Sequence, residues 1–285
     1  MHPKVSVVIP TFNREHTLRR AAQSVLAQSY TNLELIIVDD GSTDNTQAVI
    51  ESLHDPRVKS FRFTENQGAN AARNRGLKEA SGIFIAFQDS DDEWLTDKLQ
   101  QQVDACRASG SFACFCRLSR DERLAGRFVP KSSYRLVPGQ ANHANSLLYG
   151  SYMSNQTLLL HRNCFETETF DESLGRLQDW DLCMRIAGRY DFYYLAEVLV
   201  RAFTSSDRIS TGAKTYVSAV QQICAKNKAS YRKNPSALAT VTLNASVLAL
   251  KAGNLKGGFE MLRVTASAGL IAVIQALLIL ARRAF

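Results

Sequence analysis

The sequence predicts an α/β fold in which a mostly parallel sheet is flanked by helices and followed by a C-terminal helical appendage. Within the first 120 residues, short runs of apolar and β-branched residues alternate with longer segments whose apolar positions recur at helical spacing. From residue 213 onward the composition is helical throughout. A chain of 285 residues can bury a large core, either as one domain with an appendage or as two domains.

The first 90 residues contain the alternating elements. Short apolar runs predict strands at residues 5–9, 33–38 and 83–87, the first two of them buried, and an alternating run predicts another strand at residues 58–63. Segments with apolar positions at helical spacing predict the helices between them, at residues 15–28, 44–53 and 68–80. Strand and helix therefore alternate in the order that produces parallel strands joined by helical crossovers.

Beyond residue 119 the pattern is weaker. Residues 120–150 are rich in proline and glycine, and we expect a loop-rich insertion there. Another apolar run occupies residues 157–160, and residues 179–187 have helical spacing. The C-terminal helices are expected to break at Asn234-Pro235 and at Gly253-Asn254.

The C-terminal region carries the basic charge of the chain. From Thr211 onward there are ten Lys or Arg residues and one acidic residue, Glu260, which gives a net charge of +9. The first 210 residues contain 24 basic and 26 acidic groups, a net charge of −2. We therefore expect two units, residues 1–210 and residues 211–285. The basic excess indicates an anionic partner, such as a membrane surface or nucleic acid, or else a solvated basic face.

The last apolar stretch, residues 266–281, contains no charged side chain and is followed by Arg282-Arg283. Its 16 residues fall short of the roughly 20 that a helix needs to cross a bilayer. Two interpretations stay open: the stretch lies in a membrane interface, or it packs on the preceding helices.

The six cysteines include no Cys-x-x-Cys pair, which favours reduced thiols and a reducing compartment. The N-terminal residues contain no apolar region of a secretory signal peptide. We therefore expect a cytoplasmic location, with peripheral contact at the inner face of the cell membrane if the tail binds lipid.

Polar residues follow three of the four predicted strands. They occupy residues 10–14, 39–44 and 88–92, and the last run contains Asp89, Asp91 and Asp92. Ligands of open parallel sheets lie beyond the carboxyl ends of the strands. Carboxylates gathered there repel one another unless a cation lies among them, and Mg²⁺ or Mn²⁺ prefers carboxylate oxygens and bridges to phosphates. The pattern predicts a metal–diphosphate site, although Asp is also favoured in solvated turns and helix caps.

The predicted helix at 68–80 presents a polar face toward the same edge. Asn70, Arg73 and Asn74 share that face because residues three and four positions apart are neighbours on a helix. An arginine there can pair with the carboxylates or with a phosphate, unless the face is simply solvated.

Four motifs, at residues 5–14, 38–44, 65–76 and 88–92, resemble those of the family 2 glycosyltransferases in the same order. The resemblance covers about residues 4–200. It implies a GT-A fold, a nucleoside-diphosphate sugar donor with a UDP-sugar favoured, a divalent metal (Mg²⁺ or Mn²⁺), and inversion at the anomeric carbon.

By motif position, the resemblance implies that Thr11 and Asp40 lie against the nucleoside, with Asp39 nearby, and that Arg73 borders the donor. Asp91 would be the principal metal ligand. The residues expected to bind nucleotide or donor are Pro10, Thr11, Asn13, Arg14, Asp39, Asp40, Asn70, Arg73, Asp89 and Ser90, and those expected to bind metal are Asp91 and Asp92.

Residues 177–182 are similar to the family's Glu-Asp motif at the start of a helix, whose Asp is the catalytic base and aligns with Asp179. Gln178 replaces the Glu of the motif, so Asp181 stays open as an alternative. The base takes the proton of the acceptor hydroxyl that attacks C1. Otherwise Asp179 caps the helix and Trp180 packs in the core.

The predicted function is transfer of a sugar to a hydroxyl of a saccharide or lipid-linked acceptor in cell-surface polysaccharide synthesis, by analogy with the family. The insertion at 120–150 would then be mobile or specific for the acceptor, and nucleic acid is not an expected partner. The alternative is a non-catalytic nucleotide-sugar-binding or assembly protein on the same fold. The chain lacks the Gly-x-Gly-x-x-Gly and Gly-x-x-x-x-Gly-Lys motifs, which argues against dinucleotide-dependent oxidoreductases and P-loop enzymes.

Overall fold

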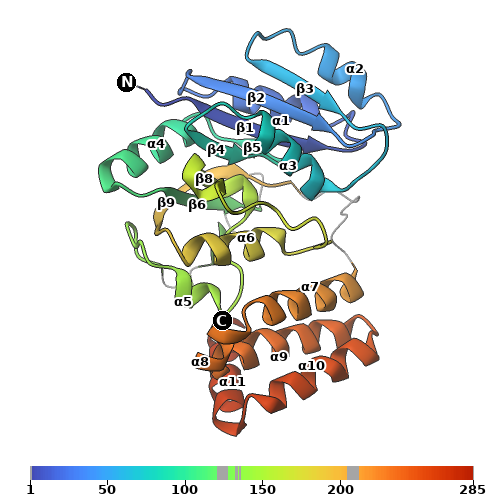
Figure 1. Ribbon diagram of the computed structural model, residues 1–285, viewed down its shortest axis with the longest axis vertical. Coiled ribbons are helices and arrows are strands. Elements are labelled where there is room, and N and C mark those ends of the chain that lie inside the picture. The colour runs from blue at the N-terminus through green and yellow to red at the C-terminus, as the bar shows by residue number, and fades with distance from the viewer. Residues whose placement is uncertain (1, 121–127, 132–133, 135, 204–211, 285) are drawn as a thin grey trace.

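The computed structural model describes residues 2–120, 128–131, 134, 136–203 and 212–284. A sheet flanked by helices forms one part of the molecule, and the C-terminal helices stack beneath it (Figure 1). The predicted fold class, an α/β sheet with a helical appendage, is confirmed. The predicted boundary at residue 210 and part of the predicted insertion, residues 121–127, lie outside the described residues.

The N-terminal half of the sheet is parallel and runs in the order β3-β2-β1-β4. Its strands are β1 (Val5–Thr11), β2 (Leu33–Asp39), β3 (Val58–Arg62) and β4 (Phe84–Phe87). The crossover helices are α1 (Leu18–Leu26), α2 (Thr46–Glu51) and α3 (Ala69–Glu79). Every residue of β1 and β2 is buried because helices cover both faces, as continuous apolar runs predict.

The sheet continues from β4 in the order β8-β6-β9-β5, with β7 beside β6. The strands are β5 (Glu93–Trp94), β6 (Ala113–Ser119), β7 (Phe128–Val129), β8 (Leu158–His161) and β9 (Phe192–Arg201). Among the described strands of this half, β6 and β9 alone pair in parallel, and β8 is antiparallel to both β4 and β6. The whole sheet is therefore mixed. An apolar run buried on both faces has the same pattern in either direction, so the sequence did not reveal this.

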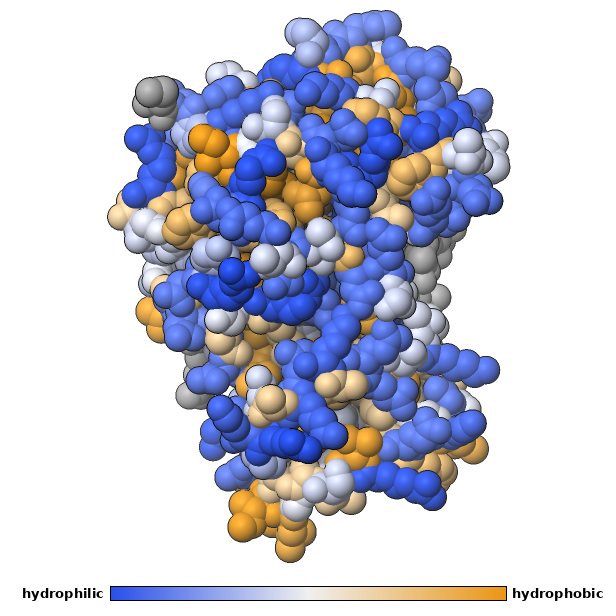
Figure 2. Space-filling view, in the orientation of Figure 1, coloured by the Kyte–Doolittle hydropathy of each residue, from blue (hydrophilic) through white to orange (hydrophobic). Residues whose placement is uncertain are grey.

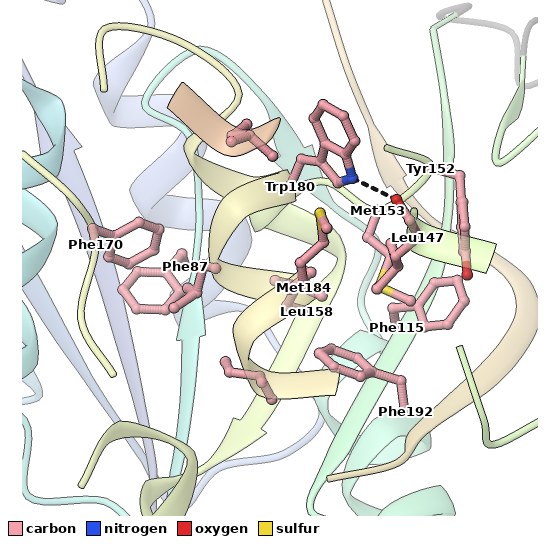
Figure 3. Close-up of a cluster of buried hydrophobic side chains, with 14 of the residues drawn as sticks. Phe87, Phe115, Leu147, Tyr152, Met153, Leu158, Phe170, Trp180, Met184 and Phe192 are labelled. Atoms are coloured by element: carbon pink, nitrogen blue, oxygen red, sulfur yellow. Dashed lines mark hydrogen bonds between the residues drawn. The ribbon is translucent and has the colours of Figure 1, made fainter. Parts of the chain in front are cut away.

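The remaining elements before residue 200 are helices and 3₁₀ turns. They are α4 (Lys98–Ser109), α5 (Ala144–Leu147), the 3₁₀ turns Asn155–Thr157 and Arg162–Phe165, and α6 (Gln178–Ala187). The side chains of α6 enter an apolar cluster between the sheet and the C-terminal helices (Figure 3). Figure 3 shows Trp180 and Met184 of α6 in this cluster, together with Phe87, Leu147 and Leu158.

The C-terminal region is helical and breaks at the two predicted places, and it also breaks at Asn227 and at Ala268-Gly269, which the sequence did not predict. Its helices are α7 (Ala213–Lys226), α8 (Lys228–Lys233), α9 (Pro235–Lys251), α10 (Leu255–Ser267) and α11 (Leu270–Ala284). Val220, Ile223, Val241 and Met261 belong to the same apolar cluster as Trp180, so the helical region and the sheet share a core. This shared core ties the two units together.

The last helix packs by one face only. Ala272 and Ala276 of α11 contact Ala239 of α9, and large apolar residues of α11 are exposed on the other side. Figure 2 shows apolar side chains gathered at this end of the molecule. Within the described residues, no single helix is long and apolar enough to cross a membrane; α10 and α11 would pass only as a pair, bent by 118° at their junction.

Candidate active site

The ends of β1 and β2 form one edge of the site. Thr11 and Asp39 are paired neighbours at the last position of the two strands, and Pro10 is buried one residue earlier. The backbone N–H of Asn13 donates to Ser42 Oγ at 2.9 Å, and the N–H of Thr43 donates to Asn13 Oδ1 at 2.8 Å. Asn13 has φ = 52°, a left-handed conformation that asparagine tolerates. These contacts fix the two strand ends to each other.

Two polar atoms at this edge are buried without a hydrogen bond from the described residues: Thr11 Oγ1 and Asp39 Oδ2. Asp39 Oδ1 accepts hydrogen bonds from the backbone N–H and hydroxyl of Ser42, whereas Oδ2 lies 3.4 Å from Arg62 Nε. Buried polar atoms are normally paired because an unmade hydrogen bond is costly. The edge therefore suits a ligand that brings polar groups of its own.

Asp40 holds the start of α3. Its Oδ1 accepts from the N–H of Gln67 at 2.7 Å and its Oδ2 from the N–H of Gly68 at 2.9 Å. Both oxygens are thus engaged by the loop that leads into the helix carrying Arg73. The sequence predicted a nucleoside contact for Asp40. In the structure its carboxylate instead fixes the loop before α3, and the nucleoside contact stays a prediction.

The carboxylates after β4 lie among arginines. Arg73 is buried, and its Nη2 donates to Asp89 Oδ1 at 3.1 Å. Arg14 Nη2 lies 3.9 Å from Asp91 Oδ2. Burial and the charge of Asp89 raise the pKa of Asp91, although Arg14 opposes the shift. Ser90, which lies between Asp89 and Asp91 in the sequence, is also buried. Each of these two carboxylates therefore faces one guanidinium group.

Asn70 was predicted to bind donor, but its amide is used inside the protein. Its Nδ2 donates to the backbone carbonyls of Asp171 and Leu174, both at 2.9 Å. Its Oδ1 accepts from Arg73 Nη1 at 3.3 Å. Asn70 thus orients the arginine, whose Nε is buried without a hydrogen bond from the described residues.

Asp92 differs from its neighbours because both of its oxygens are taken. Oδ1 accepts from the N–H of Phe203 at 2.9 Å, and Oδ2 accepts from the amide of Gln156. Burial, followed by the charges of Asp89 and Asp91, raises the pKa of Asp92 to about 8. These two hydrogen bonds hold the Asp92 side chain in place, and its predicted role as a metal ligand stays a prediction.

Three residues that support this cluster carry no signal in the sequence. Gln156 and Phe203 reach Asp92 from 64 and 111 positions away. Arg20 of α1 donates to the backbone carbonyl of Asp91, and its guanidinium stacks on the ring of Phe203 at 3.6 Å. Contacts over such separations leave no local pattern.

Replacement of Asp92 by alanine is expected to lower the free energy of unfolding by about 2–3 kcal/mol, because two buried donors lose their acceptor. Asp91→Ala is the matched control, since the side chain of Asp91 is 26% exposed and is held by no short ion pair. Chemical denaturation of both variants measures the difference. Equal free energies of unfolding for the two variants would show that the hydrogen bonds of Asp92 do not stabilise the fold.

Asp179 lies in the first turn of α6, two residues after Leu177, whose φ is 60°. Burial raises the pKa of Asp179 to about 6; the N–H of Trp180 and the charge of Arg73 lower it, and the charge of Asp89 raises it. Asp179 thus interacts with the same two residues that form the Arg73–Asp89 pair. A partly exposed carboxylate with a pKa near neutrality can remove a proton.

Asp181, the alternative base, is fully buried and doubly paired. Its Oδ2 accepts from Arg185 Nη2 at 2.9 Å, and its Oδ1 accepts from Lys226 Nζ at 2.9 Å. Both oxygens are engaged by cations, and the side chain has no exposed surface at which an acceptor hydroxyl could reach it. The geometry therefore favours Asp179 for proton removal. Trp180 between them is core, with its indole N–H donating to the carbonyl of Leu147 (Figure 3).

The site fits a divalent cation that arrives with a phosphate ligand. In the described part of the chain, no three His, Cys, Asp or Glu side chains are arranged to hold an ion together. Mg²⁺ and its relatives are usually bound by one or two carboxylates plus substrate phosphates. Asp89 and Asp91 are hard oxygen donors, and their side chains are 31% and 26% exposed.

Comparison with known proteins relates the chain to one family. The family model described as glycosyl transferase family 2 matches residues 6–164. An Escherichia coli protein, the UDP-Glc:alpha-D-GlcNAc-diphosphoundecaprenol beta-1,3-glucosyltransferase WfgD, is 46% identical over 99 residues, which are 35% of this chain and 39% of that protein. TuaG of Bacillus subtilis, described as a glycosyltransferase of teichuronic acid biosynthesis, is 31% identical over 71% of this chain and 75% of its own length.

Among solved structures, the mannosyltransferase PcManGT from Pyrobaculum calidifontis, in complex with GDP-Man and Mn²⁺, superposes with a TM-score of 0.68. The match covers 100% of this chain and 81% of that protein, at 19% sequence identity. The likeness establishes that the two chains share a fold.

Proposed function

Because the chain belongs to the family 2 glycosyl transferases, we propose that it transfers a sugar from a nucleoside-diphosphate sugar, with a UDP-sugar favoured, to a hydroxyl of a saccharide or lipid-linked acceptor. The single observation that carries the proposal is the ion pair of Arg73 and Asp89, 3.1 Å apart, whose two charges both act on the carboxylate of Asp179. A proton acceptor is thus within electrostatic reach of groups suited to a diphosphate.

The nucleoside would occupy the edge formed by β1 and β2. Thr11 Oγ1 and Asp39 Oδ2 are the buried atoms there that lack hydrogen bonds from the described residues. A base or ribose carries donors and acceptors that can pair with both atoms. Pro10, Asn13 and Asp40 support this edge by shaping the turn and the start of α3.

The diphosphate would lie between Arg73, Arg14 and the carboxylates Asp89 and Asp91. Arginine is suited to phosphate because its donors form a planar fork. Asp89 and Asp91 would hold Mg²⁺ or Mn²⁺, which when bound would stabilise negative charge on the departing diphosphate. Ser90 lies between them in sequence and completes the turn.

Asp179 would act as the base. In a single displacement the acceptor oxygen forms a bond to C1, the bond from C1 to the diphosphate oxygen breaks, and the hydroxyl proton passes to the carboxylate. Attack from the side opposite the leaving group inverts the anomeric carbon. Arg73, oriented by Asn70, would lie on the side of the leaving group.

A panel of nucleotide sugars, assayed first for binding and then for donor hydrolysis or transfer to acceptors in a membrane extract, tests this function. We expect one UDP-sugar to be bound and turned over. Binding without turnover in any extract would instead support a nucleotide-sugar-binding or assembly protein, and absence of binding would contradict both.

We further propose that the acceptor is reached at a membrane surface. The relative from Escherichia coli has, by its name, a lipid-linked acceptor. Five apolar residues of α11 are between 49% and 76% exposed: Leu270, Ile271, Ile274, Leu277 and Leu278. Their spacing places them on one stripe of the helix. The region from Thr211 onward has a net charge of +9, so an anionic lipid surface would complement the apolar stripe in polarity and the region as a whole in charge.

The combined variant Leu270→Gln, Ile274→Gln and Leu278→Gln should reduce flotation of the protein with phosphatidylglycerol vesicles by about tenfold or more, since each apolar side chain contributes when it leaves water. Ile83→Gln is the matched control, because Ile83 is an exposed isoleucine of the sheet domain. Unchanged flotation of the triple variant would contradict the proposal. A second copy of the chain could also cover the apolar stripe of α11. Size-exclusion chromatography would detect such a dimer, and a dimer lost in the triple variant would contradict the membrane proposal.

A further inference from the structure

The segment before α6, residues 170–174, is held by α3. Asn74 Oδ1 accepts from the N–H of Phe170 at 2.9 Å, and its Nδ2 donates back to the Phe170 carbonyl at 2.9 Å. Asn70 holds the carbonyls of Asp171 and Leu174, as described above. These backbone contacts connect the segment to the helix that carries Arg73.

The same segment is held from the opposite direction by α7. Lys226 is the last residue of α7, and its ammonium group donates to Asp171 Oδ2 and, at 2.9 Å, to Asp181 Oδ1. One side chain of the helical region thus joins the 170–174 segment to the first turn of α6. Its two partners lie on either side of the turn that leads to Asp179.

This bridge from Lys226 to Asp171 and Asp181 reaches a buried carboxylate, that of Asp181. Asp181 has no exposed surface, and its remaining oxygen is held by Arg185 of the same helix. Loss of Lys226 would leave a buried carboxylate with only one cationic partner, which is costly unless the helix moves. Asp179 stands two residues before Asp181 in the same turn, and Leu177 at its start has the left-handed φ of 60°. A shift at Asp181 would therefore be passed to Asp179.

We propose that Lys226 is a positioning residue for the base Asp179, acting through Asp181 and Asp171. The proposal rests on the proposed function of the site. The sequence assigns α7 to a separate basic region. By this proposal, α7 instead contributes a residue that helps to position the catalytic base. The alternative is a bridge that contributes to stability alone, and the two differ in what happens to turnover in the folded protein.

The test compares Lys226→Met with Lys226→Arg and Lys228→Met in the full chain. Lys228 is an exposed lysine two positions further on, with no ion pair among the described residues. In Lys226→Met we expect kcat per folded molecule to fall about tenfold or more, with KM for the donor within about twofold, because a misplaced base slows the chemical step without weakening donor binding. Lys226→Arg should restore most of kcat, and Lys228→Met should match wild type.

Wild-type kcat in Lys226→Met, or equal losses in kcat and in donor affinity, would overturn the proposal, since neither is the effect of a misplaced base. Absence of turnover in the wild type would count against the proposed function instead. Amide hydrogen exchange then tests the bridge without activity. Exchange in residues 170–181 should rise in Lys226→Met and stay unchanged in Lys228→Met; no difference between these variants would overturn the bridge.

Discussion

Replacement of Asp179 by asparagine is expected to lower kcat by about 10³-fold, within the range that general bases contribute. The change keeps the shape of the side chain and removes its ability to accept a proton. The affinity for the donor should stay within about twofold, because the groups proposed to bind the donor lie at the ends of β1, β2 and β4 and on α3, not on α6. Steady-state transfer assays and donor titration by calorimetry measure the two quantities separately.

The pH dependence gives an independent check on Asp179. Its pKa is raised to about 6, so the protonated form, which cannot act as a base, persists to higher pH than in an ordinary aspartate. The kcat of the wild type should therefore decrease as the pH falls through about 6. Asp191→Asn, an exposed position just after α6, is the matched control and should leave kcat unchanged. Retention of more than a tenth of kcat in Asp179→Asn would exclude Asp179 as the base.

Removal of the Asp91 side chain is expected to lower turnover by a similar factor, because it removes a proposed metal ligand instead of the base. Asp91→Ala should lower turnover of the nucleoside-diphosphate sugar by about 10²- to 10⁴-fold, because stabilisation of the leaving diphosphate amounts to several kcal/mol. EDTA should abolish turnover by the wild type, and added Mg²⁺ or Mn²⁺ should restore it. Full activity in EDTA would falsify the proposed metal requirement.

The contrast between Asp91 and Asp92 sharpens this experiment. The side chain of Asp91 is partly exposed and lies 3.9 Å from Arg14, its ion-pair partner among the described residues, whereas Asp92 is buried and accepts two hydrogen bonds. Asp91→Ala should therefore be inactive but normally stable. Asp104→Ala, on the exposed face of α4, controls for the loss of one carboxylate and should be fully active.

Much of this protein was determined by the sequence alone. The apolar runs of β1 to β4 and the helices between them are local patterns, and they predicted the parallel half of the sheet within a few residues at each end. The positions of Asp39 and Asp89 at strand ends follow from the same patterns, because parallel strands end at one edge. The break between α8 and α9 was likewise local, since proline begins a helix more readily than it continues one.

The tertiary structure decided the roles of neighbouring acids that the sequence could not distinguish. Asp179 and Asp181 stand two residues apart on one helix, but only Asp181 meets Lys226, 45 positions away. Asp91 and Asp92 are adjacent, but only Asp92 is enclosed by Gln156 and Phe203. Periodicity records which face of an element is buried, not which distant side chain arrives there. The role open to each carboxylate depends on which distant side chain it meets. The charge or hydrogen bond of that partner determines whether a carboxylate oxygen is free to bind substrate or accept a proton.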